Sequence, residues 1–162
     1  MNLHRLLQQR IMEGGPPVRV GLIGAGKFGS MFLSQVPTIR GLEIPVIADL
    51  DPDRARVACH KVGWDAARID RTAFVASGTE ACGYPDVDVV VEATGSPAAG
   101  IAHARAAVAA GKHIVMVNVE ADVLAGPLLA AEARSKGVVY SLAYGDQPAL
   151  TCELVDWARM RL

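Results

Sequence analysis

The chain has 162 residues, a formal net charge of −1, and a composition that is 51% hydrophobic. This length suits one well-buried domain, and the hydrophobic content argues against a disordered chain. The near-neutral charge gives no electrostatic surface for nucleic acid or an anionic membrane, and no apolar run reaches the ~18 residues of a transmembrane helix.

Residues 2–13 carry aliphatic side chains at helical spacing, which predicts an amphipathic helix. The stripe consists of Leu3, Leu6, Leu7 and Ile11. Gly14-Gly15-Pro16-Pro17 ends the helix. We therefore assign 1–17 to an N-terminal helix and linker, which packs on the domain or on a neighbouring segment, and 18–162 to a dinucleotide-binding domain.

The main domain opens with an apolar run, 18–23, that leads into Gly-x-Gly-x-x-Gly. In the dinucleotide interpretation, Gly24 permits a tight strand-to-helix turn and Gly26 lets the backbone approach a pyrophosphate. Gly29 lets the following helix, about 27–37, pack closely on the strand. The alternative is a glycine-rich turn without a ligand.

The pyrophosphate would lie at the N-terminus of that helix, where free N–H groups and the helix dipole favour an anion. Lys27 and Phe28, between the second and third glycines, belong to the same predicted site.

A second apolar strand, Glu43 to Asp49, ends in an acidic residue 25 positions after Gly24. A carboxylate there accepts hydrogen bonds from the adenosine ribose and repels a 2′-phosphate, so Asp49 favours NAD. Asp51-Pro52 is interpreted as the N-cap and first residue of the next helix, about 52–62. Lys27, Arg54 and Arg56 keep NADP open, although a solvated helix face explains them as well.

The region from Trp64 to Pro85 is less regular; we expect a short strand at 73–76 and a short helix at 79–82. A continuous apolar strand, 88–92, then leads into a helix at 98–110 that Ser96-Pro97 begins. Thr94 and Gly95, after that strand, are candidates to lie beneath the ribose or the nicotinamide end of the cofactor. His103 is interpreted as a surface or packing residue.

The remaining chain predicts a strand at 113–117, a helix at 124–136 and a strand at 138–142. A last helix begins near Ala149 and continues to Leu162. This alternation indicates an α/β fold with a doubly wound parallel sheet and right-handed crossovers, the Rossmann arrangement.

The carboxyl ends of parallel strands form the ligand crevice of such a sheet. Asn118, Glu120 and Asp122 follow one of these strands and could contact nicotinamide or substrate, or cap the loop. Asp146 and Gln147 follow the last strand and could face the same crevice, or Asp146 could cap the last helix. Glu120 and Asp146 are weak candidates for a catalytic acid or base, and the sequence does not decide which group acts.

Cys59, Cys82 and Cys152 form no Cys-x-x-Cys pair and, with the four histidines, no metal-ligand pattern. No metal site is predicted. We interpret the cysteines as buried free thiols, which indicates a reducing, cytoplasmic location.

Four motifs at strand ends stand out: Val-Gly-Leu-Ile-Gly-Ala-Gly-Lys-Phe-Gly, Ile-Ala-Asp-Leu-Asp-Pro-Asp-Arg-Ala, Val-Val-Val-Glu-Ala-Thr-Gly and Ala-Gly-Lys-His-Ile-Val. Together they resemble the cofactor domain of homoserine-dehydrogenase-like oxidoreductases, and the broader Gfo/Idh/MocA family shares much of the pattern. Val-Asn-Val-Glu-Ala-Asp and Gly-Asp-Gln-Pro look most like a subgroup of larger proteins with a SAF domain. That subgroup includes 1-deoxy-D-xylulose 5-phosphate reductoisomerase-like enzymes, which implies NADPH.

One position departs from these families. Homoserine dehydrogenases carry Asn-Lys after the fifth strand and many Gfo/Idh/MocA members carry Glu-Lys, whereas this chain has Glu120-Ala121. The lysine that would polarise a carbonyl or relay a proton is absent, which argues against ordinary homoserine dehydrogenation. Cofactor binding is unaffected.

The resemblance implies an NAD(P)-dependent oxidoreductase acting on a small polar carbonyl or alcohol. Such enzymes build the substrate pocket, and often a homo-oligomer, with a C-terminal domain that we expect to lie outside this chain. The alternative is a dinucleotide-binding regulatory or sensor module without catalysis.

Overall fold

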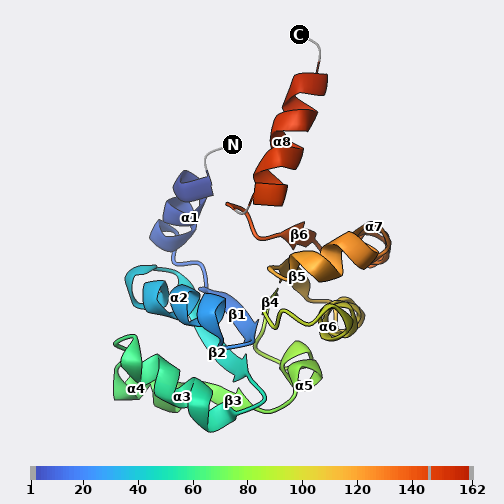
Figure 1. Ribbon diagram of the computed structural model, residues 1–162. Coiled ribbons are helices and arrows are strands. Elements are labelled where there is room, and N and C mark those ends of the chain that lie inside the picture. Colours follow the sequence, from blue (N-terminus) through green and yellow to red (C-terminus); the bar gives the residue numbers. More distant parts are fainter. Residues whose placement is uncertain (1–2, 146, 161–162) are drawn as a thin grey trace.

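The fold is seen in a computed structural model that describes residues 3–145 and 147–160 (Figure 1). Six parallel strands lie in the order β3-β2-β1-β4-β5-β6. Their bounds are β1 Val18–Ile23, β2 Leu42–Ala48, β3 Ala73–Val75, β4 Val89–Glu92, β5 His113–Met116 and β6 Tyr140–Leu142. The strand order reverses between β1 and β4, which confirms the doubly wound α/β sheet.

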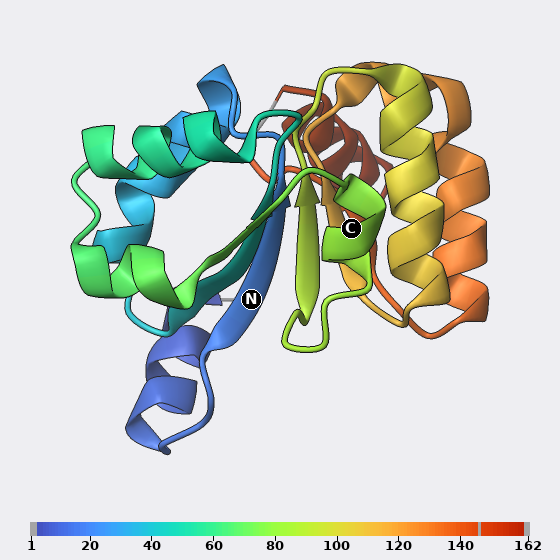
Figure 2. The same ribbon diagram turned by 90° about the horizontal axis from the view of Figure 1, so that it is seen from below.

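Helices cover both faces of the sheet (Figure 2). One face carries α2 (Lys27–Gln35), α3 (Pro52–Lys61) and α4 (Ala66–Arg71), with a 3₁₀ turn, Val36–Thr38, after α2. The other carries α5 (Gly78–Cys82), α6 (Pro97–Ala109) and α7 (Val119–Ser135). Two further helices, α1 (Leu3–Met12) and α8 (Gln147–Arg159), extend away from these layers.

The core lies on both faces of the sheet because the central strands are apolar on both sides. Leu22 and Ile23 are adjacent in β1 and are buried in opposite core clusters. Trp64 joins the cluster of Leu22, and its indole N–H donates to the carbonyl oxygen of Leu33 at 2.8 Å. This bond fastens the turn after α3 to α2 and satisfies a polar group that would otherwise be buried unpaired.

Two helices differ from the sequence-based expectation. The α7 helix begins at Val119, not at Leu124, because the Asn118 side chain accepts a hydrogen bond from the Ala121 N–H at 3.1 Å and caps the helix earlier. Pro127 therefore lies inside the helix. The α4 helix was not expected; Asp65 caps it by accepting from the Arg68 N–H at 2.7 Å.

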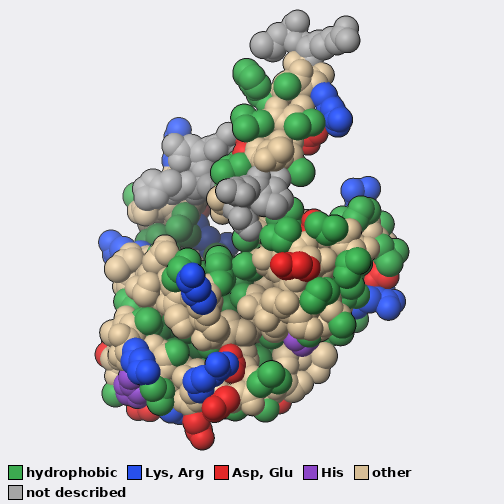
Figure 3. Space-filling view, in the orientation of Figure 1, with side chains coloured by type: hydrophobic (Ala, Val, Ile, Leu, Met, Phe, Trp, Pro, Cys, Tyr) green, Lys and Arg blue, Asp and Glu red, His purple; other side chains and the backbone are tan. Residues whose placement is uncertain are grey.

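The α8 helix is exposed along its described side chains, from Leu150 to Met160. It ends at Arg159, short of the end expected at Leu162, which lies outside the described residues. Cys152 is exposed on it, so the expectation of three buried thiols is wrong for this one, whereas Cys59 and Cys82 are buried. Hydrophobic side chains gather over α8 and α7 (Figure 3). None of the described helices is both long and apolar enough to cross a membrane.

The two tryptophans provide a matched test of the packing. Trp64 is 4% exposed and Trp157 is 66% exposed. We expect Trp64→Ala to lower the free energy of unfolding by about 3–5 kcal/mol, because it opens a cavity and leaves the Leu33 carbonyl unpaired. Trp157→Ala should change it by less than about 0.5 kcal/mol. Urea unfolding followed by far-UV circular dichroism measures both, and equal effects of the two substitutions would contradict this packing.

Candidate functional site

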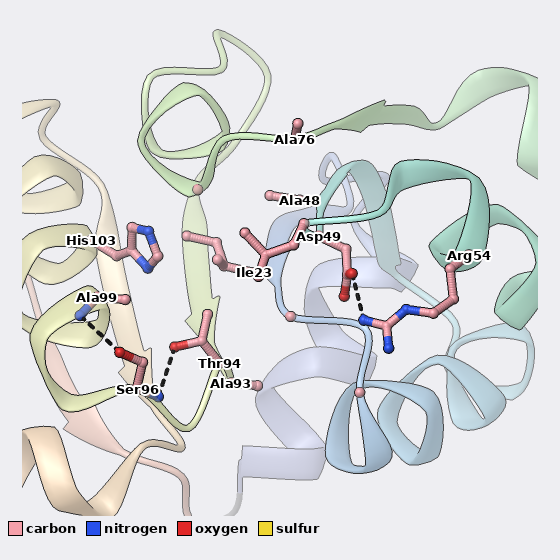
Figure 4. A pocket seen from close by; sticks show the side chains of 14 residues that line it. Ile23, Ala48, Asp49, Arg54, Ala76, Ala93, Thr94, Ser96, Ala99 and His103 are labelled. Carbon is pink, nitrogen blue, oxygen red and sulfur yellow. Dashed lines mark hydrogen bonds and ion pairs between the residues drawn. The ribbon is translucent and has the colours of Figure 1, made fainter.

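A cleft of about 370 Å³ opens at the carboxyl ends of β1, β2 and β4 (Figure 4). Among the sequence-predicted residues, Gly24, Gly26, Asp49 and Thr94 line it. Its other walls are mostly small or aliphatic side chains: Ile23, Ala48, Leu50, Ala76, Gly78, Ala93 and Ala99. Ser96, Arg54 and His103 add polar groups.

Each glycine of the loop between β1 and α2 has a separate structural reason. Gly24 has φ +96°, and a Cβ there would lie 2.8 Å from the Ala93 carbonyl oxygen. A Cβ on Gly29 would overlap the Gly24 carbonyl oxygen, so this residue permits α2 to pack on the turn. A Cβ on Gly26 would meet nothing within 4 Å, because this residue faces open space.

Gly26 is also the N-cap of α2 and has no side chain to cap it. The N–H groups of the first turn, including those of Lys27 and Phe28, therefore receive no side-chain acceptor from the N-cap. Both side chains are exposed and neither lines the cleft. At the N-terminus of α2, an anion would find free N–H groups and the positive end of the helix dipole.

Asp49 follows β2 and is 7% exposed. One carboxylate oxygen, Oδ2, accepts from the Ala25 N–H at 2.8 Å. The other, Oδ1, accepts from the Asp51 N–H at 3.1 Å and from the Arg54 guanidinium at 2.6 Å. Burial raises the pKa of this carboxyl, but the hydrogen bonds from Arg54 and the two amides outweigh it, and the net pKa is lowered. Asp49 therefore carries a negative charge in the cleft at neutral pH.

The other charged residues near Asp49 differ in whether they line the cleft. Asp51 caps α3 by accepting from the Arg54 N–H at 3.0 Å, as predicted. Arg54 lines the cleft with a side chain that is 63% exposed. Arg56 lies over the Phe74 ring at 4.5 Å from its centroid and does not line the cleft. Arg54 is thus the cation that shares the cleft with Asp49.

On the opposite wall, Glu92 at the end of β4 is fully buried. Its Oε1 accepts from the Thr94 hydroxyl at 2.5 Å and from the Thr94 N–H at 3.3 Å, and lies 3.2 Å from His103 Nδ1. Its Oε2 has no hydrogen-bond partner among the described residues. Gly95, with φ +72°, continues the same loop outside the cleft lining.

The sequence interpretation missed the pair of Glu92 and His103. His103 was expected to be a surface or packing residue, yet its side chain is 13% exposed and lines the cleft. A carboxylate that ends an otherwise apolar strand was the available signal, because a buried charge requires partners.

The residues after β5 and β6 are less closely connected with the cleft. Asn118 is 3% exposed; besides capping α7, its amide donates to the Ser96 carbonyl oxygen at 2.8 Å. Glu120 is exposed in the first turn of α7, and Asp122 accepts from the Tyr140 hydroxyl at 2.7 Å. None of the three lines the cleft. Asp146 lies outside the described residues.

Among the described residues, no group of three His, Cys, Asp or Glu side chains is placed to hold a metal ion. Burial raises the pKa of Cys59 to about 11, and burial together with Glu92 does the same for Cys82, so both thiols are protonated at neutral pH.

Several solved structures share this fold. An NAD-binding oxidoreductase from Klebsiella pneumoniae is 24% identical, with TM-score 0.62 over 88% of this chain and 39% of that chain. A homoserine dehydrogenase from Thiobacillus denitrificans is 24% identical, with TM-score 0.65 over 78% and 29%. A Synechocystis biliverdin reductase in complex with biliverdin and NADP⁺ is 22% identical, with TM-score 0.61 over 79% and 38%.

This chain spans about a third of the length of those proteins. The comparison with curated proteins gives no significant match. A family model described as an oxidoreductase family with an NAD-binding Rossmann fold matches residues 18–144, which is most of the chain and contains the whole cleft. The chain therefore belongs to the Gfo/Idh/MocA oxidoreductase family.

Proposed function

We propose that the cleft binds NAD and that the protein transfers a hydride between this cofactor and a small polar carbonyl or alcohol. The observation that carries the proposal is the presence of two complementary groups at one cleft. The α2 N-terminus at Gly26 is open to an anion, and the ionised Asp49 carboxylate lines the same cleft beside the glycine loop.

In this proposal the pyrophosphate lies against the glycine loop, where Gly24, Gly26, Lys27, Phe28 and Gly29 bring backbone N–H groups close to it. Asp49 accepts hydrogen bonds from the hydroxyls of the adenosine ribose. Three of the roughly four acceptor positions of a carboxylate are already used by Ala25, Asp51 and Arg54. A ribose hydroxyl would take the fourth position or displace Arg54.

Thr94 and Gly95 are placed beneath the cofactor's ribose or its nicotinamide end, and Asn118 on the nicotinamide side. Thr94 is held by Glu92, and the Asn118 amide holds the carbonyl of Ser96 in the same loop. The bound cofactor would supply the hydride, and these residues would hold its reactive end in position.

The substrate class and the catalytic acid or base are proposals on the family resemblance. A homoserine dehydrogenase-like or 1-deoxy-D-xylulose 5-phosphate reductoisomerase-like reaction fits a small polar substrate, and the SAF-domain subgroup would use NADPH. Ala121 is fully buried where homoserine dehydrogenases and many Gfo/Idh/MocA members carry lysine, so Glu120 at the start of α7 and Asp146 are the remaining candidates.

The substrate pocket is proposed to be completed by a C-terminal domain, and the longer protein to form a homo-oligomer. The length of the solved relatives and the exposed apolar side chains Leu150, Leu154 and Trp157 on α8 support further polypeptide packed against this domain. Turnover by the longer protein distinguishes an enzyme from a dinucleotide sensor: cofactor binding without oxidation or reduction of any carbonyl or alcohol would favour the sensor.

Cofactor choice is testable at Asp49. We expect NADH to bind more tightly than NADPH, because the Asp49 carboxylate repels a 2′-phosphate. Asp49→Asn should lower the dissociation constant for NADPH relative to that for NADH by about tenfold, equivalent to about 1.4 kcal/mol. Cofactor fluorescence titration measures both constants.

Asp51→Asn is the matched control, because Asn also caps helices well and Asp51 does not line the cleft. The ratio of its two dissociation constants should equal that of the wild type. Tighter binding of NADPH by the wild type, lost in Arg54→Gln, would instead assign the choice to Arg54 and NADP.

The glycine loop offers a test that separates folding from binding. Gly26→Ala places a methyl group in open space, so we expect stability to change by less than about 1 kcal/mol and NADH affinity to fall by more than about tenfold. Gly29→Ala should instead destabilise the fold, because its Cβ would overlap the Gly24 carbonyl. Thermal melts and NADH titration check both, and wild-type affinity in Gly26→Ala would overturn the pyrophosphate assignment.

A further inference from the structure

We propose that His103 recognises the adenine base of the cofactor by accepting a hydrogen bond from its exocyclic amine at Nε2. This inference rests on the proposed binding of a dinucleotide in the cleft. It adds a specificity-determining residue on α6, outside the strand-end motifs that carry the family resemblance.

The direction of the ligand follows from the groups already placed. With the pyrophosphate at Gly26 and the adenosine ribose at Asp49, the base must leave the ribose on the side away from the glycine loop. The cleft continues there between Leu50 and Ala76 on one side and Ala99 and His103 on the other. Figure 4 shows His103 across the cleft from Asp49, with Ile23 and Ala48 between them.

This part of the cleft suits a flat heterocycle. Ala76 and Ala99 have small side chains and Gly78 has none, which leaves room between the walls. Leu50 lines the cleft with a side chain that is 96% exposed. A planar base covering Leu50 would remove apolar surface from water.

Glu92 determines which nitrogen of His103 carries the proton. Oε1 of Glu92 accepts from the N–H and the hydroxyl of Thr94 and lies 3.2 Å from His103 Nδ1, so we assign the proton of this contact to Nδ1. In a neutral imidazole with Nδ1 protonated, Nε2 is a hydrogen-bond acceptor. An acceptor matches the amine of adenine and opposes the carbonyl oxygen that hypoxanthine carries at the same position.

Gly78 does not block Nε2 in the plane of the ring. A Cβ on Gly78 would overlap Nε2 and would lie 2.7 Å from Cε1 and 2.8 Å from Cδ2 of His103. Such short and nearly equal distances to both carbons place Gly78 over the face of the ring, not along the in-plane lone pair. Of the described residues, only Glu92 makes a hydrogen bond to the ring. Gly78 thus fixes the ring while leaving Nε2 for a ligand.

The test compares NADH with reduced nicotinamide hypoxanthine dinucleotide at pH 8. The wild type should bind NADH at least about fivefold more tightly than the hypoxanthine analogue, because the analogue places its carbonyl oxygen, an acceptor, against the acceptor Nε2. His103→Asn retains a donor at the position of Nδ1 for Glu92 and removes Nε2. We expect it to bind both dinucleotides equally, with a melting temperature close to that of the wild type.

Two further readouts keep the result independent of folding. Reduced nicotinamide mononucleotide, which has no adenine, should bind the wild type and His103→Asn equally. In ¹⁵N-resolved NMR of the wild type, NADH should shift the Nε2 resonance of His103 and the mononucleotide should not. If NADH still binds but neither the preference for adenine nor the Nε2 shift is found, the role of His103 is overturned and the proposed function stands. If neither NADH nor NADPH binds the wild type, the proposed function itself fails.

Discussion

The Asp49 carboxylate joins three parts of the chain that meet only at the carboxyl edge of the sheet. It ends β2, accepts the Ala25 N–H of the glycine loop, and holds both the backbone of Asp51 and the guanidinium of Arg54 at the start of α3. A charge that is 7% exposed is tolerated because these donors replace its water. The glycine loop is therefore held in place before a ligand enters, which lowers the entropy lost on binding.

Glu92 has the corresponding position on the other side of β1. It holds Thr94 through two hydrogen bonds and orients His103, while the Asn118 amide binds the next turn of the same loop at Ser96. The two loops also touch directly, since Gly24 has no room for a Cβ against the Ala93 carbonyl. Asp49 after β2 and Glu92 at the end of β4 thus hold the two loops that border the cleft. We expect a substitution of either residue to move the loop at the proposed pyrophosphate position.

At the opposite edge of the sheet, the ion pairs of Arg19 hold the chain together. Arg19 in β1 bonds to Asp86 and Asp88 at 2.9 Å each, which fastens β1 to the segment before β4. The hydrogen bond from Arg19 lowers the pKa of Asp88. A larger hollow of about 640 Å³ lies at this edge, lined by Arg19, Arg40 and Arg71 among others, but it is far from the glycine loop. The carboxyl ends of the strands and the free N–H groups of α2 face the smaller cleft. We therefore propose the smaller cleft as the functional one.

The local sequence was sufficient for features that depend on neighbouring residues. The α/β class follows from alternating apolar runs and helices, and the Gly24 turn follows from its glycine. The caps by Asp51 and Ser96 follow from side chains that bind the backbone three residues on. Asp49 was assigned by its distance from Gly24. Only the tertiary structure could show that the Asp49 carboxylate holds the glycine loop and Arg54. The same is true of Asn118, which caps α7 five residues earlier than expected, and of His103 on α6, which contacts Glu92 on β4. These contacts join residues from separate elements, and no periodicity or motif in one stretch of sequence encodes which side chains meet when a sheet and its helices pack.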